Sequence, residues 1–292
     1  MAGSEFSVVP SDAIEFLNSL PKGSVDLVLG SPPYEARRTY GLGFSLEGED
    51  WVRWMVDVFR AALRCCKGLV AFVVQGCTKK FRYSAVPALL MADLHRAGIC
   101  LRNPPIYHRI GIPGSGGPDW FRGDYEWVIC ATNGGRLPWA EPTACGHPPR
   151  WAPGGEMSYR TKDGRRINAQ LSRKVTHPTE QGHRTKVYRE PAKANPGNVI
   201  SCTVGGGHMG SKLASENEAP YSESLVRRFV LSFSPPGGSV CDPFSGSGTT
   251  GAVAVEFGRH FLGSDIRADQ VELSKRRIAE KLERMRGKSM AS

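Results

Sequence analysis

Short apolar segments alternate with segments of helical periodicity in two separate stretches of this sequence, and no other feature restricts the fold as much. In the first stretch, strands are predicted over residues 25–29 (VDLVL), 69–74 (LVAFVV) and 125–131 (YEWVICA). Residues 49–66 place apolar side chains at helical spacing, and residues 84–97 predict another helix. Strands that alternate with helices are typical of an α/β fold with a doubly wound, mostly parallel sheet.

The alternation returns late in the chain. Helices and strands are predicted there over residues 221–233, 239–241, 248–258, 260–264 and 268–286. Between the two stretches, residues 133–212 are rich in Gly, Pro, Ser and Thr, and hold 13 Lys or Arg against 5 Asp or Glu. We therefore predict one core made of residues 7–132 and 213–286, a loop-rich basic insert over 133–212, and a tail over 287–292.

The net charge and the apolar segments of the chain indicate its partner and its cellular location. Lys and Arg number 38 against 28 Asp and Glu, a net charge of +10, which favours a polyanionic partner over ordinary solubilising charge. No apolar run approaches the ~20 residues that cross a bilayer, and no secretory signal is present, so we expect a cytoplasmic protein with no membrane partner. The opening MAGSEF is typical of an expression remnant, and residues 1–6 are left out of the predicted fold.

The cysteines give no sign of a metal site. All eight are scattered, and no Cys-x-x-Cys pair occurs. A structural zinc site normally shows paired ligands at short spacing, whereas Cys145 and His147 form a single half-pair. We expect reduced, mostly buried thiols and no metal.

A rigid turn, Ser31-Pro32-Pro33-Tyr34, directly follows the first predicted strand. Two prolines cannot continue a strand ladder and fix an extended turn. A plain strand-ending turn would explain the prolines alone. The serine before them and the aromatic residue after them make this loop a candidate for chemistry.

A second loop, residues 240–250 (VCDPFSGSGTT), joins a predicted strand to a predicted helix, and its glycines let the backbone approach a ligand. Asp265 follows the next strand, 19 residues after Gly246, the usual spacing for a carboxylate that binds ribose hydroxyls. The loop contains no Gly-Lys-Ser/Thr, and we predict a nucleoside without a pyrophosphate, although Gly246-Ser-Gly248-Thr-Thr-Gly251 also fits the Gly-x-Gly-x-x-Gly pattern of dinucleotide sites. Because ligands bind beyond the carboxyl ends of the strands in open α/β sheets, both loops should open on the same edge.

Together these residues resemble the amino-methylating DNA methyltransferases, in the group whose catalytic motif precedes the cofactor motif. Ser11-Asp12, an amphipathic stretch and LVLGSPPY match the start of the family. Residues 122–129 (RGDYEWVI) resemble the segment before its target-recognition region, and residues 220–225 (PYSESL), DPFSGSGTT and Gly263-Ser-Asp265 resemble its cofactor half. The family carries a variable DNA-reading region where this chain has 133–212, so the resemblance implies a target-recognition insert there.

The resemblance implies an S-adenosyl-L-methionine-dependent enzyme that methylates an exocyclic amino group of a base flipped out of double-stranded DNA. In the catalytic Ser31-Pro32-Pro33-Tyr34 motif, the Ser31 hydroxyl and the Pro32 carbonyl would accept hydrogen bonds from the amino group, and Tyr34 would stack on the base. Methylation of a ring carbon would need a cysteine nucleophile, usually after proline, and no Pro-Cys dipeptide occurs.

For the cofactor, the resemblance places residues of the second loop at the methionine end: Asp242, Phe244, Gly246, Gly248 and Thr249. Asp265 would bind the ribose. Asp12 would bind the adenine amino group or cap a helix, two roles that the sequence does not separate.

The target and the partners stay open in part. Arg165, Arg166, Arg173 and Lys174 are the predicted DNA contacts. Relatives that methylate adenine usually carry Asp where this chain has Ser31, which favours N4 of cytosine over N6 of adenine. RNA or a protein amide as substrate, and a catalytically silent DNA-binding regulator, are the other readings. A restriction-modification partner would be a separate chain, and the apolar helix over 49–66 serves either the core or a homodimer.

Overall fold

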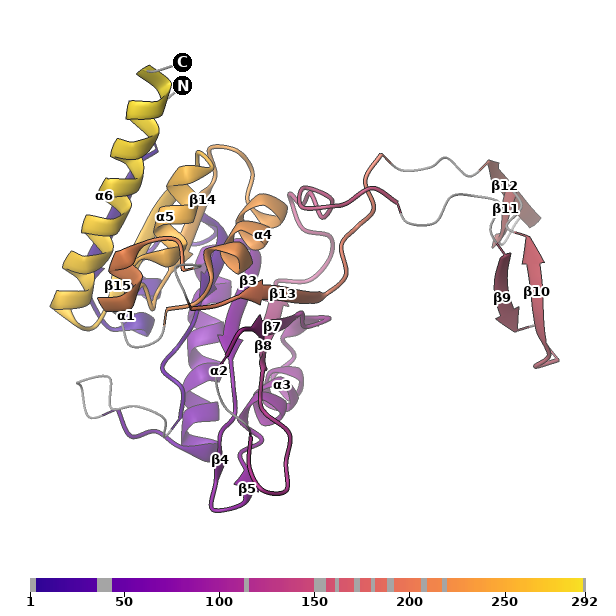
Figure 1. The fold of residues 1–292 in the computed structure, drawn as a ribbon, viewed down its shortest axis with the longest axis horizontal. Coiled ribbons are helices and arrows are strands. Elements are labelled where there is room, and N and C mark those ends of the chain that lie inside the picture. The colour runs from indigo at the N-terminus through magenta and orange to yellow at the C-terminus, as the bar shows by residue number, and fades with distance from the viewer. Residues whose placement is uncertain are drawn as a thin grey trace. The chain divides into compact units, whose positions relative to one another are not determined.

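The protein is described by a computed structural model (Figure 1). It describes residues 4–35, 44–112, 116–149, 156–160, 163–170, 174–179, 182–187, 192–205, 209–216 and 220–290. The chain divides into two compact units, one made of Met1–Glu141 and Gly197–Ser292, the other of Pro142–Pro196.

The first unit is built on a sheet of nine strands among the described residues. In sheet order they are β1 (Phe6–Pro10), β15 (His260–Asp265), β14 (Ser239–Asp242), β2 (Val25–Gly30), β3 (Cys66–Val74), β8 (Tyr125–Thr132), β7 (Ile106–Ile110) and β13 (Val199–Thr203), with β6 (Cys100–Arg102) also paired to β8. The five strands from β1 to β3 are parallel. Strand β8 is antiparallel to β3 and to β7, and β13 is parallel to β7. The predicted mostly parallel sheet is confirmed.

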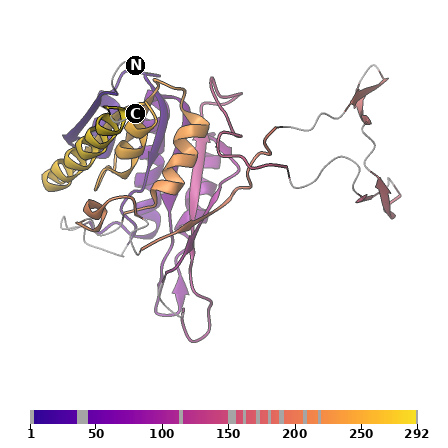
Figure 2. The ribbon, with the colours of Figure 1, turned by 45° about the horizontal axis from the view of Figure 1, so that its top comes forward.

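Helices cover both faces of this sheet (Figure 2). They are α1 (Ala13–Ser19), α2 (Gly48–Cys65), α3 (Val86–Arg96), α4 (Glu223–Phe233), α5 (Thr249–Glu256) and α6 (Ala268–Met290). Successive side chains of a strand point to opposite faces. Val28 of β2 accordingly packs with residues of α1, α2 and α3, whereas Leu27 and Leu29 pack with residues of α4, α5 and α6.

The sheet departs from the prediction at its ends. Phe6, which we left out with residues 1–6, is the first residue of β1 and pairs with Phe261 of β15. Strand β13 lies inside the predicted insert 133–212, yet it pairs with β7 in the first unit. The second unit therefore starts later and ends earlier than the predicted insert.

The second unit contains two antiparallel hairpins among its described residues. Strand β9 (Glu156–Arg160) pairs with β10 (Arg166–Gln170), and β11 (Lys174–Thr179) pairs with β12 (Gly182–Val187). The composition of this segment had predicted loops. Its short, polar strands lack the apolar alternation that marks a half-buried strand in a sequence.

Candidate active site

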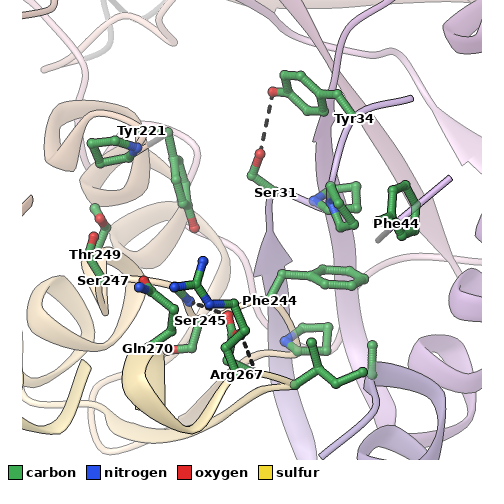
Figure 3. Close-up of a pocket in the computed structure, with 18 of the residues that line it drawn as sticks. Ser31, Tyr34, Phe44, Tyr221, Phe244, Ser245, Ser247, Thr249, Arg267 and Gln270 are labelled. Atoms are coloured by element: carbon green, nitrogen blue, oxygen red, sulfur yellow. Dashed lines mark hydrogen bonds between the residues drawn. The ribbon is translucent and has the colours of Figure 1, made fainter. Parts of the chain in front are cut away.

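A cavity of about 650 Å³ lies in the first unit, at the carboxyl ends of the central parallel strands. Both predicted loops line it: residues 31–34 after β2, and residues 243–247 after β14. Asp265, at the end of β15, also lines it. Figure 3 shows Ser31 and Tyr34 on one side, Arg267 and Gln270 on the other, and Phe244 between them. The prediction that both loops open on one edge is confirmed.

A chain of polar contacts holds the Ser31–Tyr34 loop. The Ser31 hydroxyl lies 3.4 Å from the Tyr34 hydroxyl, which donates to Glu126 Oε2 at 2.7 Å. Glu126 is only 5% exposed, and its other oxygen lies 2.9 Å from Nη1 of Arg109. A buried carboxylate with a guanidinium partner stays a strong acceptor. The side chain of Tyr34 is therefore held at both ends, by the loop backbone at one end and by the hydrogen bond of its hydroxyl at the other.

A tryptophan of α2 anchors the backbone of the same loop. Nε1 of Trp51, a fully buried residue of α2, donates to the Pro33 carbonyl at 2.9 Å. Pro32 is buried, and Pro33 cannot donate from its nitrogen. The loop is thus a rigid element with its serine and tyrosine side chains on the cavity wall.

Asp242 lies behind the cavity wall and does not line it, which corrects our expectation for this residue. It is fully buried and accepts from the Phe244 N–H at 2.9 Å, from Thr250 Oγ1 at 2.5 Å and from the Tyr221 hydroxyl at 3.3 Å. Burial raises the pKa of Asp242 to about 7. These bonds show that Asp242 shapes the loop.

Gly248 also supports the loop without lining the cavity. It caps α5 with a left-handed φ of 76°. A Cβ there would lie 2.6 Å from the Ser274 Oγ and 2.9 Å from the Ser274 Cα. Only glycine allows α5 to begin this close to α6. Gly246, in contrast, does line the cavity.

Asp265 lies on the cavity wall as expected. Its Oδ2 accepts from the Gly246 N–H at 2.9 Å, and its Oδ1 accepts from the Arg267 N–H at 3.0 Å. Burial raises the pKa of this carboxyl, and the two backbone hydrogen bonds oppose that shift. Since a carboxylate can accept about four hydrogen bonds, Asp265 keeps acceptor capacity for a ligand.

Asp12 caps a helix, one of the two roles that the sequence left open. Its Oδ1 accepts from the Ile14 N–H at 2.8 Å and from the Glu15 N–H at 3.2 Å, so it is the N-cap of α1. The same residue lines the cavity. The cap is shown, and contact with a ligand stays a prediction.

Phe244 and Thr249 also line the cavity. The Phe244 ring meets Trp54 and Phe72 edge to face, each at 5.8 Å between centroids. The Thr249 hydroxyl accepts from Nη1 of Arg277 at 2.9 Å. The cavity wall thus has an apolar part, with Phe244 and Trp54, and a polar part, with Thr249.

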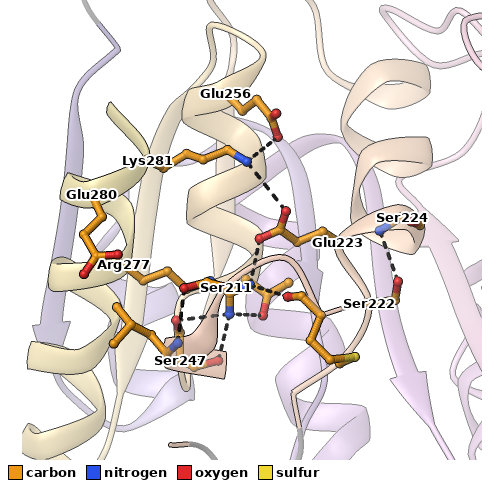
Figure 4. A network of polar contacts seen from close by, with 12 residues as sticks. Ser211, Ser222, Glu223, Ser224, Ser247, Glu256, Arg277, Glu280 and Lys281 are labelled. Carbon is orange, nitrogen blue, oxygen red and sulfur yellow. Dashed lines mark hydrogen bonds and ion pairs between the residues drawn. The ribbon is translucent and has the colours of Figure 1, made fainter. Parts of the chain in front are cut away.

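Arg277, 2% exposed, ties the second loop to α6 (Figure 4). Besides Thr249, it contacts Ser247 Oγ at 3.1 Å and Glu223 Oε1 at 2.8 Å. Lys281 joins the same network, 3.6 Å from Glu223. The network fixes the loop from outside the cavity.

Several residues of the cavity wall were missed by sequence reasoning, among them Gln75, Arg109, Tyr221, Arg267 and Gln270. Both glutamines carry a buried Oε1 that has no hydrogen-bond partner in the described structure. Such atoms cost free energy unless a ligand or water pairs with them. Gln75 follows β3 at the carboxyl edge and could have been predicted on that ground; no signal pointed to Gln270.

The predicted DNA contacts lie in the second unit. Arg165 is exposed, with Nε 3.5 Å from Asp163. Arg166 and Lys174 begin β10 and β11, and Arg173 falls outside the described residues. Binding of DNA by these four residues stays a prediction.

The remaining expectations concern metals, membranes and thiols. No group of three or more His, Cys, Asp or Glu among the described residues could hold a metal ion. No helix in the described part is long and apolar enough to cross a membrane. Six of the eight cysteines are buried and all are free, as predicted. Burial raises the pKa of the Cys66 and Cys130 thiols to about 12.

Comparison with known proteins gives a family match over most of the chain. The model of a family described as "DNA methylase" matches residues 25–276. The DNA adenine methyltransferase YhdJ of Escherichia coli (strain K12) is 23% identical over 273 residues, which cover 93% of this chain and 82% of YhdJ.

Two solved structures share the fold. The cytosine-N4-specific PvuII DNA methyltransferase superposes with a TM-score of 0.67 at 16% identity, over 97% of this chain and 93% of its own. TTHA0409 of Thermus thermophilus, complexed with S-adenosyl-L-methionine, gives a TM-score of 0.56 at 22% identity, over 96% and 94% of the two chains.

Proposed function

The chain belongs to the DNA methylase family and is a DNA methyltransferase, and on that premise we propose that it methylates an exocyclic amino group of a base flipped out of duplex DNA, with S-adenosyl-L-methionine as methyl donor. One observation carries the proposal. The Ser31–Tyr34 loop and the glycine loop before α5, more than 200 residues apart in the sequence, line the same cavity. A methyl transfer needs donor and acceptor side by side in a single site.

The cavity suits the cofactor. Asp265 offers carboxylate lone pairs to ribose hydroxyls, and Gly246 brings backbone close to the ligand without a side chain. The unpartnered Gln270 Oε1 is a further acceptor on the same wall. When bound, the cofactor supplies an electrophilic methyl group on a sulfonium. The rest of the chemistry falls to positioning by the chain.

Ser31 and Pro32 would bind the base amino group. The lone pair of this nitrogen is delocalised into the ring, so acceptors on its two hydrogens favour a tetrahedral, nucleophilic geometry. The Pro33 carbonyl already accepts from Trp51, which leaves the Ser31 hydroxyl and the Pro32 carbonyl for this task. The Ser31 hydroxyl can rotate from donor to acceptor.

Tyr34 would stack on the flipped base. Its hydroxyl is held by Glu126, and Glu126 is held by Arg109. The ring is therefore oriented before a base arrives, and preorganisation of this kind lowers the entropic cost of binding. Base–aromatic stacking is worth about 1–3 kcal/mol.

We favour N4 of cytosine as the target because the catalytic motif begins with Ser31. N6 of adenine is the second candidate, because YhdJ, a DNA adenine methyltransferase, is related over 93% of this chain. The insert, with Arg165, Arg166, Arg173 and Lys174, would read the DNA sequence.

The base is tested by expressing the protein in a host that lacks its own DNA methylation and sequencing the host DNA by a method that separates the two modifications. We expect N4-methylcytosine within one short recurring sequence. N6-methyladenine there would overturn the choice of base but keep the reaction. Unmodified DNA, with methyl transfer instead to RNA or a protein amide in vitro, would overturn the DNA substrate. Cofactor binding without any transfer would indicate a silent regulator.

The catalytic loop is tested by single-turnover methylation with radiolabelled cofactor. Ser31→Ala should lower the rate by about 10²–10³, with cofactor and DNA affinity nearly intact, because the lost acceptor acts mainly in the transition state. Tyr34→Phe keeps the stacking ring and loses the contacts of the hydroxyl with Glu126 and Ser31, so it should be milder than Tyr34→Ala. If all three variants methylate DNA at the rate of the parent, the loop is a plain strand-ending turn and takes no part in catalysis.

A further inference from the structure

Four exposed aromatic side chains lie on two surface segments of the first unit, outside the cavity, and two of them, Phe81 and Trp120, are in contact. Phe81 and Tyr83 lie on the hairpin of β4 (Thr78–Lys79) and β5 (Arg82–Tyr83), and Trp120 and Phe121 lie in the segment between β7 and β8. We call these four residues the aromatic tip. Phe81 is 73% and Phe121 98% exposed. Large rings this exposed are unusual in groups and mark an interaction surface.

Both segments of the aromatic tip are joined along the chain to residues of the cavity wall. The hairpin begins three residues after Gln75, and the other segment runs into Glu126; both of these residues line the cavity. The Phe81 and Trp120 rings meet edge to face at 5.7 Å. Figures 1 and 2 both show the hairpin beside the β7–β8 connection, projecting beyond the sheet.

Lys80 and Phe81 form the two-residue turn of this hairpin, and a turn of this length commonly needs positive φ at both positions. Lys80 and Phe81 both have positive φ, 47° and 63°, the only non-glycine residues in the described chain that do. This conformation costs free energy and is uncommon for a bulky side chain. On the other segment, a Cβ on Gly117 would lie 2.1 Å from the Trp120 ring, so the glycine is what lets that ring fold back.

The charge around the aromatic tip selects the partner. Lys79, Lys80 and Arg82 are exposed on the hairpin, and residues 78–83 contain no acidic side chain. On the other segment the exposed Asp119 precedes Trp120, and the exposed Arg122 follows Phe121, so the excess of positive charge lies on the hairpin. Lys79 is paired with Glu47 at 3.2 Å. Exposed cations beside exposed rings match a polymer of phosphates and stacked bases: the cations bind phosphates, and apolar rings insert between bases that have been unstacked.

We propose that the aromatic tip is a DNA-contact surface, and that Phe81 and Phe121 stack against bases next to the flipped one while Lys80 and Arg82 bind the adjoining phosphates. This deepens the proposed function and rests on it, because it takes duplex DNA as the substrate. The surface would hold open the duplex that has lost a base to the cavity.

The test separates rings from charges. The probe is a duplex oligonucleotide that contains the sequence methylated in the host. The double variant F81A/F121A should bind it about 10-fold or more weakly, because each ring loses its stacking. Its salt dependence should stay that of the parent. The double variant K80A/R82A should instead flatten the slope of log K against log salt by roughly 0.9 per lost phosphate contact.

Matched controls keep the result interpretable. F81Y/F121Y retains the rings and should bind like the parent. Val9→Ala removes an exposed apolar side chain from β1, at the end of the sheet, and should change nothing. Cofactor affinity should be unchanged in every variant, which shows that the fold is intact.

DNA affinity and salt slope equal to the parent's in both double variants would overturn the proposal, provided that the parent methylates the duplex. A parent that forms dimers and a F81A/F121A variant that does not would also overturn it, since the tip would then bind a second copy of the chain. Failure of the proposed function gives a different result: the parent itself does not bind or methylate DNA.

Discussion

Asp242 provides the sharpest test of how the glycine loop is built. This carboxyl is fully buried, and its nearby hydrogen-bond donors are neutral: the Phe244 N–H and the hydroxyls of Thr250 and Tyr221. Desolvation is the largest effect on it and raises its pKa from 3.8 to about 7, while the three hydrogen bonds lower it. Burial therefore wins over hydrogen bonding at this site.

The sign of the effect on stability follows from this shift. Between pH 3.8 and about 7 the folded state keeps the Asp242 proton that the unfolded state has already released. The stabilising contribution is thus complete below pH 3.8 and is lost as the pH rises through the folded pKa. The slope is about 1.4 kcal/mol per pH unit, so from about pH 5 to about pH 7 the free energy of unfolding should fall by about 2–3 kcal/mol through this residue.

Asp242→Asn removes the titration and keeps the shape of the side chain. Urea unfolding, followed by tryptophan fluorescence, should show that the variant loses about 2–3 kcal/mol less than the parent over that pH range. Asp57→Asn, at an exposed site on α2, is the control and should follow the parent. If Asp242→Asn and the parent lose stability equally, Asp242 does not hold a proton in the folded state and the reasoning fails.

Three other outcomes are expected. Asp265→Ala should weaken cofactor binding about 10–150-fold in calorimetry, with the fold intact; unchanged affinity would remove this residue from the site. Arg277→Met should lower the free energy of unfolding by about 3–5 kcal/mol because Glu223 loses its buried partner, and adding Glu223→Gln should restore part of it. Alanine at Arg165, Arg166, Arg173 and Lys174 should flatten the salt dependence of DNA binding, by roughly 0.9 in slope per lost phosphate contact. If the variant keeps the slope of the parent, these four side chains are exposed to solvent and do not bind DNA.

The central part of the fold could be predicted because burial imposes a periodicity on the sequence. The apolar side chains of residues 49–66 repeat at helical spacing, and α2 spans Gly48–Cys65. The run LVAFVV is fully buried in β3. A strand covered on both faces leaves such a continuous apolar run, and this holds for β2 and β3 at the centre of the sheet.

Strands at the margin carry no such signal. Strand β7 (IYHRI) has only Tyr107 buried, and β13 (VISCT) buries Ile200 and Cys202 within a polar, glycine-rich context. Their pairing is a long-range contact between segments about 90 residues apart. Periodicity reports the burial of single residues and not their partners, which is why β13 was assigned to the insert.

The candidate site shows the same division. Ser31–Tyr34, Gly246 and Asp265 could be found because strand ends and glycine loops mark the edge of the sheet in the sequence itself. Arg109 and Glu126 could not, because they reach the cavity only through the order of β3, β8 and β7 in the sheet. Because β8 is antiparallel to β3 and β7, its start, with Glu126, lies at the edge of the sheet where β3 and β7 end.

Asp242 and Asp265 show how two carboxylates next to one glycine loop acquire different tasks. Asp242 is fully desolvated and Asp265 largely so, and burial raises the pKa of each. Asp242 is fully enclosed, and its bonds to Phe244, Thr250 and Tyr221 spend its acceptor capacity on the loop. Asp265 accepts one backbone N–H on each oxygen and lies on the cavity wall, so it retains acceptors for a ligand. Replacing Asp242 should therefore change stability and its pH dependence first, whereas replacing Asp265 should change affinity first. If both variants lost stability in the same way, or both lost ligand affinity in the same way, Asp242 and Asp265 would not have separate tasks.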